Sequence, residues 1–366
     1  MNTKHDYTGK TIYVGIDVHK KTYACASICE GEVIKRDSMP ADPERLVKYL
    51  NNTFRGAEIK TAYEAGFSGF HLHRYLTSHG IESNVVHPGA IEVASRNRVK
   101  TDKRDALKIV KQFSDGRIKG IHIPSEAEEY QRSVTRLRTN ILRLRTQVAN
   151  KLKSLLFTQG LITKDDDKKV SRHWIDEKLT EIKSKVISND FYYVANQYAE
   201  EWIQLTDRIK GINQQLALQA KADAGLQMIY ESVPGIGLIH ARELINELGD
   251  MKQFKNEKQL FSFTGLTPSE CSSGEHTRHG HITRQGRAVF RKILVEAAWV
   301  AIKKDANLQE IYQRLSQHRG KKRAIVGIAR RLIGRIRSCI SKGSLYDVNH
   351  KNVVVQEPIC ATSSLF

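Results

Sequence analysis

The sequence predicts a mixed α/β domain, a pair of long helices and a second, mainly helical domain, in that order. Three observations lead to this prediction. Short β-rich runs alternate with helical patterns up to about residue 120, two heptad seams follow between about 125 and 222, and helical patterns predominate from 226 to about 342.

The N-terminal domain opens with three short β-rich runs, which tight connections join as in an antiparallel meander. Helices and strands alternate after them, and Pro43 suits the first turn of the first helix. The expected strands are 11–18, 22–29, 32–38, 58–64 and 83–87, and the expected helices are 42–50, 69–79 and one from Thr101. Three antiparallel strands followed by β-α units form a mixed sheet with helices on its faces, which is the ribonuclease H arrangement.

The middle segment repeats apolar residues with 3,4 spacing, the pattern of a coiled coil. One seam is Val134, Leu137, Ile141, Leu144, Val148 and Leu155, with Lys151 in an apolar slot, and the other is Trp202, Leu205, Ile209, Ile212 and Leu216. We expect an antiparallel coiled-coil arm with the charged connection 164–188 exposed at its tip. A helical hairpin within a core is the alternative.

Four carboxylates stand at the ends of predicted elements. Asp17 closes the first strand, Glu64 closes the fourth, and Asp102 and Asp105 lie three apart at the start of a helix. Carboxylates from three elements can hold two hard cations, which activate a nucleophile and stabilise a leaving oxygen at phosphorus. The alternative for Asp102 and Asp105 is a solvated helix N-terminus, where aspartate suits the helix dipole.

The composition favours a polyanionic partner. The chain has 366 residues, with 59 Lys and Arg against 40 Asp and Glu, a net charge of +19, and nucleic acid is the leading candidate. No apolar stretch approaches the ~18 residues of a membrane span. Because the first residues also lack a signal-peptide core, we expect a cytoplasmic protein without a membrane partner. The five scattered cysteines fit no zinc spacing and are expected to be reduced thiols.

Two glycine-containing motifs in the C-terminal region could contact phosphate. The segment 233–237 precedes an amphipathic run, so Gly235 and Gly237 open a helix with free backbone N–H groups, as in helix-hairpin-helix modules; a packing turn is the alternative. The segment 263–287 reads as a basic, glycine-rich loop, in which phosphate contacts are expected from Arg278 and Arg284. Ser272 or Ser273, beside Gly274, could be an exposed nucleophile, although Ser-Ser-Gly is also an ordinary turn.

The last expected helix is basic and amphipathic. No acid occurs between Glu310 and Asp347, whereas Arg330, Arg331 and Arg335 lie on this helix. Its apolar face consists of Ala324, Ile325, Ile328, Leu332 and Ile336. The pattern favours contact with a nucleic-acid backbone, and charge that serves only solubility is the alternative.

In their order, these motifs resemble the DEDD transposases of bacterial insertion sequences, the serine-bearing recombinases that a bridge RNA guides. The resemblance spans nearly the whole chain. It is carried by Gly15–Lys20, Tyr63–Gly66, Thr101–Ala106, Val233–Gly237 and the stretch from Phe263 to Gly274.

The resemblance implies an architecture and a set of site residues. It implies a RuvC-like domain at 8–122, a coiled-coil arm with a charged insertion at 123–225, a transposase domain at 226–345 and a tail at 346–366. It implies that Asp17, Glu64, Asp102 and Asp105 bind two Mg²⁺ ions, for which Mn²⁺ can substitute. It also implies that Ser273, directly before glycine, attacks DNA and forms a covalent phosphoserine. The implied partners are the double-stranded DNA of donor and target, a guide RNA and further copies of the chain, as a homodimer or homotetramer.

Three other functions share part of this pattern. A metal-dependent junction-resolving nuclease would use the same acids with water as the nucleophile, and would need no serine. An actin-like phosphotransferase also opens with Gly-Ile-Asp, but it needs a second phosphate loop, which the sequence lacks. A binding protein without catalysis would retain the basic surface but would give no reason for four carboxylates at strand and helix ends.

Overall fold

The protein divides at Pro124 into two compact units, residues 1–124 and 125–366. The computed structural model describes residues 6–92, 102–164, 169–185, 187–273 and 276–348, and for 102–103, 270–273 and 276–279 it describes the backbone alone. In these residues no helix combines the length and apolar character that crossing a membrane requires. The finer division at 225 and 345 stays a prediction.

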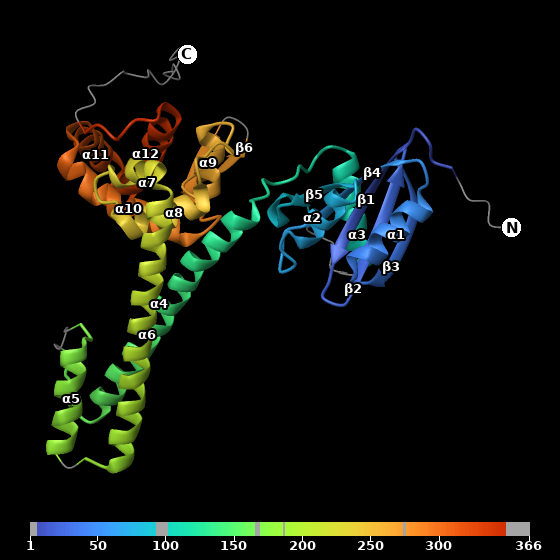
Figure 1. Ribbon diagram of the computed structural model, residues 1–366. Coiled ribbons are helices and arrows are strands. Elements are labelled where there is room, and N and C mark those ends of the chain that lie inside the picture. The colour runs from blue at the N-terminus through green and yellow to red at the C-terminus, as the bar shows by residue number, and fades with distance from the viewer. Residues whose placement is uncertain (1–5, 93–101, 165–168, 186, 274–275, 349–366) are drawn as a thin grey trace. The chain divides into compact units, whose positions relative to one another are not determined.

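The first unit contains a mixed five-stranded sheet (Figure 1). Its strands are β1 (Thr11–Val18), β2 (Thr22–Cys29), β3 (Glu32–Pro40), β4 (Glu58–Glu64) and β5 (Glu82–Val86). The order in space is β3-β2-β1-β4-β5, antiparallel among the first three strands and parallel from β1 to β4 to β5. The mixed sheet expected from the sequence is therefore confirmed.

Helices cover both faces of this sheet. They are α1 (Pro43–Thr53), α2 (His71–Ser78) and α3 (Asp102–Ser114), with a short 3-10 helix η1 (Pro88–Ala90). Leu46 of α1 and Leu76 of α2 pack with Ile12, Val14 and Ile16 of β1 on one face. On the other face, Ala106 and Val110 of α3 pack on small residues of β2. Because side chains of a strand alternate between faces, Gly15 and Asp17 of β1 share the α3 face.

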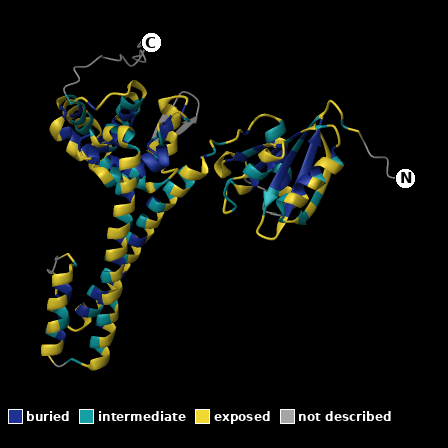
Figure 2. Ribbon diagram, viewed as in Figure 1, coloured by how far each residue is buried: buried dark blue, intermediate teal, exposed yellow. Residues whose placement is uncertain are grey.

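The second unit is mainly helical. Its helices are α4 (Glu126–Thr158), α5 (Arg172–Ser184), α6 (Asn189–Ala222), α7 (Ala224–Glu231), α8 (Leu238–Leu248), α9 (Glu257–Thr264), α10 (Ala288–Lys304), α11 (Ala306–Arg319) and α12 (Lys321–Lys342), and its strands are β6 (Pro268–Ser273) and β7 (His276–Ile282). Helices α7 to α12 surround a core in which Leu294, Leu332 and Ile333 are fully buried (Figure 2). The apolar face expected of α12 is confirmed, since all five of its expected residues are buried.

Helices α4 and α6 pack side by side over much of their length (Figure 1). A capping box begins α4, with Ser125 and Glu128 each bonding the other's backbone N–H. The expected seam of α6 is mostly buried, but Leu137 and Leu144 of the α4 seam are 45% and 41% exposed. Ile141 and Val148 of that seam are buried as expected, and Leu152 and Leu156, which the seam did not include, are buried with them. Since an α-helix drifts relative to a strict heptad, the α4 seam was wrong at two positions, and the coiled-coil geometry stays a prediction.

The charged connection between α4 and α6 is not wholly exposed, which corrects the sequence prediction. Residues 172–184 form α5, and this helix buries Trp174, Ile175 and Ile182 against the α4–α6 pair. Many charges in this segment obscured an apolar face at helical spacing. Residues 165–168 and 186 lie outside the described part of the chain.

Candidate functional site

Asp17 and Glu64 lie at the same edge of the first sheet. Strands β1 and β4 are parallel, and their last paired positions are Ile16 and Tyr63. Asp17 and Glu64 are each one residue further on, so they lie opposite each other on strands that are about 4.8 Å apart. Ala62 shares a cluster with Ile109 of α3, and by alternation Glu64 lies on that same face. Both acids therefore belong to the face that α3 covers.

Helix α3 runs antiparallel to β1 and brings its first turn to this edge. The rings of Tyr13 and Phe113 meet with centroids 5.6 Å apart. Gly15 lies two residues after Tyr13 on β1. A Cβ on Gly15 would lie 2.4 Å from the carbonyl oxygen of Ala106 and 2.6 Å from the amide nitrogen of Val110. From Gly15 to Asp17 the strand advances by about 6.6 Å. Along the antiparallel helix the same distance corresponds to about four residues back towards its N-terminus. Asp17 is thus level with the turn from Asp102 to Asp105.

The described carboxylates at this edge each have a partner or face solvent. Asp17 Oδ2 lies 3.1 Å from Nε2 of His19, and Asp105 Oδ1 accepts a hydrogen bond of 2.7 Å from Lys108 Nζ. Glu64 is exposed, and the side chain of Asp102 lies outside the described residues. Within the described part, no three His, Cys, Asp or Glu side chains are close enough to hold a metal ion. The donors are carboxylates, as a hard cation requires, so occupancy would need exchange of these partners and a contribution from Asp102.

The glycine-rich segment 263–287 contains a β-hairpin, where the sequence analysis expected a loop. Strands β6 and β7 pair antiparallel, with Ser272 opposite Thr277 and Ser273 opposite His276. Two residues connect the strands, which is the shortest common hairpin link. Ser273 is the last residue of β6. The side chains of Ser272, Ser273 and Arg278, and the whole of Gly274, lie outside the described residues.

Close backbone contacts fix the base of this hairpin. Gly265 has φ +68°, and a Cβ there would lie 2.1 Å from the carbonyl oxygen of Gln285. Gly286 has φ +71°, and a Cβ there would lie 2.2 Å from the carbonyl oxygen of Phe263. Arg291 Nη1 donates to the carbonyl oxygens of Thr264 at 3.2 Å and Gln285 at 3.0 Å. The two glycines are therefore needed for backbone approach, and they give the hairpin a rigid root.

The arginines proposed for nucleic-acid contact differ in their surroundings. Arg284 is exposed and has φ +56°, a conformation that costs a non-glycine residue about 1 kcal/mol. Arg331 is exposed, and Arg330 lies 4.5 Å over the ring of Phe261. Arg335 points inward, where it bonds Asp305, Asn307 and the hydroxyl of Tyr346. The structure thus gives Arg335 an interior partner set that the charge pattern did not predict.

The turn at 233–237 has a packing role. Gly235 has φ +88°, and a Cβ there would meet Ala297 and Val300 at 2.9 Å. Gly237 is exposed and precedes the first turn of α8 without a side-chain cap. Arg242, one turn further, is 1% exposed and bonds Asp223 and Asn246. Burial lowers the pKa of its guanidinium, which nevertheless stays charged in proteins. The contact of Gly235 and Gly237 with phosphate stays a prediction.

A buried ionic cluster joins α4, α8 and the segment after the hairpin, and sequence reasoning missed it. Glu247 is buried and accepts two hydrogen bonds from Arg136, at 2.9 and 3.0 Å. Arg287, directly before α10, lies 3.0 Å from the same carboxylate. Glu243 accepts from Arg138 at 2.8 Å. The hydrogen bonds that Arg136 donates to Glu247 raise the pKa of Arg136, whereas burial lowers the pKa of Arg287.

One sequence signal could have revealed this cluster. Glu243 and Glu247 lie four apart on α8, and Arg132 and Arg136 lie four apart on α4. Acids and arginines on one helical face each are typical of paired helices. The run 238–248 was interpreted as amphipathic, but positions 241–248 are all buried.

Comparison with known proteins gives two family matches. Residues 14–158 match a transposase model of the IS110 DEDD type, and residues 228–313 match the transposase IS116/IS110/IS902 family. Three relatives match most of this chain. The y4qE protein of Sinorhizobium fredii is 29% identical and covers 78% of this chain and 71% of its own. The transposase for insertion sequence element IS1533 of Leptospira borgpetersenii is 28% identical, with 79% and 85% covered. The transposase for IS1111A of Coxiella burnetii is 23% identical, with 86% of both chains covered.

The fold is consistent with the first of these matches. The mixed sheet, with a mainly helical C-terminal region, is consistent with a DEDD transposase that has a ribonuclease-H-like domain. In both matched segments, and by the names of these relatives, the chain is similar to DEDD transposases of the IS110/IS116 family.

Proposed function

We propose that this protein cuts and rejoins the DNA strands of an insertion sequence, with Asp17, Glu64, Asp102 and Asp105 binding magnesium and Ser273 forming a covalent bond to DNA. The observation that carries the proposal is the meeting of the β1 and β4 ends with the first turn of α3. Three elements thereby direct carboxylates to one edge of the sheet. The family matches support the same reaction class.

The carboxylates and the serine would have separate roles. Divalent ions, when bound, supply Lewis-acid stabilisation of the phosphate oxygens. The serine hydroxyl forms an O–P bond while a P–O bond to deoxyribose breaks, and the departing sugar oxygen takes up a proton. Reversal of this step with another strand's hydroxyl rejoins the DNA, which conserves the phosphodiester bond energy. Deprotonation of the serine is easier where positive charge lies close by.

The remaining partners also belong to the proposal. A guide RNA would supply sequence choice by base pairing, and the protein would read backbone and shape. Arg278, Arg284, Arg330, Arg331 and the backbone at Gly235 and Gly237 would contact nucleic acid, whereas the interior bonds of Arg335 favour a structural role for it. Because the acids and the serine lie in different compact units, a homodimer or homotetramer could combine them from different protomers.

A trapping experiment tests this proposal. DNA that carries the gene's own flanking sequences, with a nick that prevents rejoining, is incubated with Mg²⁺ or with EDTA. A protein–DNA adduct should form only with the metal, and peptide mapping should place the bond on Ser273. Ser273→Ala should bind DNA without forming the adduct, and Ser272→Ala should retain most activity. Efficient cleavage with no adduct in all three proteins would instead favour the nuclease that uses water.

A further inference from the structure

A shallow groove of about 460 Å³ lies between α4 and α6, away from the candidate sites described above. Ile209 and Ala217 form its apolar part. Its polar lining comes from Arg145, Thr206, Lys210, Asn213 and Gln214. The lining is thus cationic and rich in hydrogen-bonding groups, and it contains no carboxylate.

The charge of α4 is one-sided. Residues 130–158 contain seven arginines and lysines and no acid: Arg132, Arg136, Arg138, Arg143, Arg145, Lys151 and Lys153. The first three donate to groups of α8. For the last four, no carboxylate partner is found in the described part of the chain. The cations of the groove therefore remain available for an external anion.

Aromatic rings hold two of these cations in place. Arg145 lies 5.7 Å over the ring of Trp202, and Lys151 lies 6.0 Å over the ring of Tyr198. A ring attracts a cation without neutralising its charge, and the N–H donors of the cation stay free. Arg145 is therefore positioned at the groove while it keeps its donors for a ligand.

The amides of the groove define the rest of the ligand. Asn213 Oδ1 accepts a hydrogen bond of 2.7 Å from Arg138 Nε, so its NH₂ group is the end that remains for a partner. Gln214 and Thr206 can each donate and accept. Donors next to two cations suit phosphate oxygens, and acceptors beside them suit a 2′-hydroxyl group. Its volume of about 460 Å³ is that of a small-ligand site, which suits a few groups of one strand and not a duplex.

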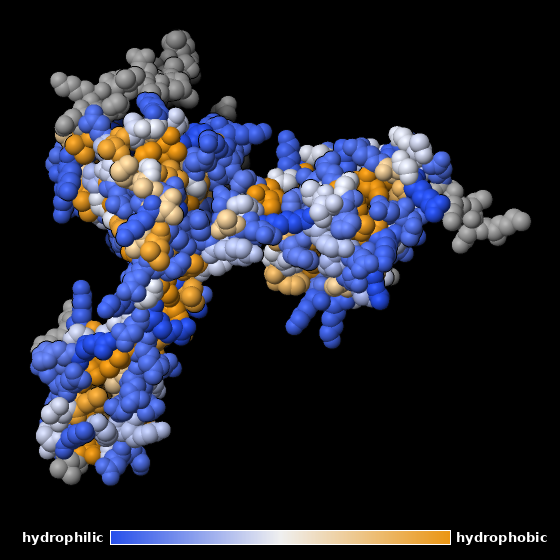
Figure 3. Space-filling view, in the orientation of Figure 1, coloured by the Kyte–Doolittle hydropathy of each residue, from blue (hydrophilic) through white to orange (hydrophobic). Residues whose placement is uncertain are grey.

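We infer that this groove binds the sugar-phosphate backbone of single-stranded RNA. The inference deepens the proposed function and rests on it, since it gives a guide RNA a binding surface on the α4–α6 pair. Figure 3 shows hydrophilic residues over much of the visible surface of this pair, with apolar patches between them.

Fluorescence anisotropy with an unstructured RNA of about 12 nucleotides tests the groove on the full-length protein. Replacing Arg145 and Lys210 by Gln removes two cations. The dissociation constant should rise about tenfold at moderate salt, and the log–log salt slope should fall by about 1.4, as expected for two phosphate contacts with a single strand. Gln214→Glu, which places an acid in the groove without removing a packed side chain, should weaken binding in the same direction.

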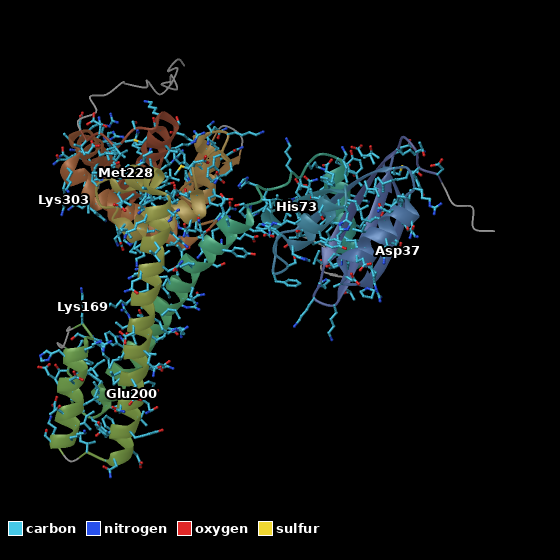
Figure 4. The ribbon with its side chains drawn as sticks, viewed as in Figure 1. Asp37, His73, Lys169, Glu200, Met228 and Lys303 are labelled. Atoms are coloured by element: carbon cyan, nitrogen blue, oxygen red, sulfur yellow. The ribbon has the colours of Figure 1, made fainter. Side chains whose placement is uncertain are left out.

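The matched control removes the same charge elsewhere in the second unit. Lys303 and Lys304 are exposed at the end of α10, and Figure 4 labels Lys303. Replacing both by Gln should leave RNA affinity within about twofold of wild type. Equal affinity of the groove variant and this control would overturn the inference. So would equal or tighter binding of DNA of the same sequence, or of duplex RNA.

The adduct assay, carried out on the same proteins, separates this inference from the proposed function. If the groove variants bind RNA normally while the wild type forms the adduct, RNA binding at the groove is ruled out and the proposed function stands. Absence of any Ser273 adduct, with RNA binding that still depends on the groove, would overturn the covalent mechanism alone.

Discussion

Acidic side chains have opposite environments in the two units. In the first unit, Asp17, Glu64 and Asp105 lie at one sheet edge, where Asp17 contacts His19, Asp105 accepts from Lys108 and Glu64 is exposed. In the second unit, Glu243 and Glu247 are buried, and arginines bond both of them. Exposed carboxylates with weak partners can exchange them for a ligand, whereas buried carboxylates with guanidinium partners cannot do so without a large cost. The difference distinguishes the edge to which we assign the reaction from a structural junction.

The largest effect is expected from removing one carboxylate of the sheet edge. Asp105→Asn should lower DNA cleavage by about a thousandfold, because loss of a metal ligand costs several kcal/mol of transition-state stabilisation. Thermal unfolding with and without Mg²⁺ gives an independent measurement. The rise in Tm that Mg²⁺ causes in the wild type should be absent in this variant.

Asp115→Asn is the matched control for this substitution. Asp115 follows α3 and is exposed beside Arg117. It should retain both cleavage and the Mg²⁺-dependent rise in Tm. If Mg²⁺ raises the Tm of Asp105→Asn as much as that of the wild type, Asp105 does not belong to the proposed metal site.

The second prediction concerns the buried junction. Glu247→Ala leaves Arg136 and Arg287 without their carboxylate, and it should reduce the free energy of unfolding by about 2–3 kcal/mol. This is less than the 3–5 kcal/mol of a fully buried pair, because Arg136 is 47% exposed. Denaturant unfolding measures the change.

The comparison variant for the junction is Glu44→Ala in the first unit. Glu44 pairs with Lys48 on the exposed face of α1, with 63% of its side chain accessible. Loss of this pair should cost no more than about 0.5 kcal/mol. Similar losses for the two variants would show that the junction is no more structural than a surface ion pair.

The third prediction concerns the approach of α3 to β1. Gly15→Ala places a methyl group against the backbone of Ala106 and Val110, which cannot move without shifting the helix. We expect a loss of about 1–3 kcal/mol in unfolding free energy, as for overpacked cores. Cleavage should also decrease, because the first turn of α3 moves away from Asp17.

Gly211→Ala tests the opposite case in the second unit. Gly211 lies within α6, with no atom within 4 Å of a Cβ, so alanine should raise stability by up to about 1 kcal/mol. Stability of Gly15→Ala equal to wild type would contradict the close contact between β1 and α3.

The smallest effect concerns pH. His73 of α2 is partly buried (Figure 4), and burial lowers its pKa from 6.5. Below about pH 6.5 the unfolded chain binds a proton that the folded chain does not yet bind, so stability should fall as pH decreases from there through the folded pKa. Above this range the contribution is constant. His73→Gln should flatten the profile, and the exposed His71→Gln should not; identical profiles for wild type and His73→Gln would rule out this origin.

The sequence predicts the first unit better than the second for a physical reason. Alternation and tight turns are local properties, so the sequence alone predicts the strands of the first unit. Asp17 and Glu64 are recognisable because they stand where two of these strands end. The register that puts these two residues opposite each other is not local, and only the structure supplies it. The β6–β7 hairpin escaped prediction since Pro, Ser and Gly also form loops. The interior positions of Arg335 and Arg242 were not predicted, because their partners Asp305 and Asp223 lie on other elements, 30 and 19 residues away in the sequence.

The contact at Gly15 has a consequence for how such chains can change length. One residue inserted in α3 between Asp105 and Val110 would turn Asp105 by about 100° around the helix axis, because each residue advances by 1/3.6 of a turn. The contact of Ala106 and Val110 with Gly15 sets the rotation of the helix, so the inserted residue could not be absorbed there. Insertions and deletions in related genes should therefore be absent from residues 105–110 of α3, while the turn at Glu30–Gly31 can vary in length.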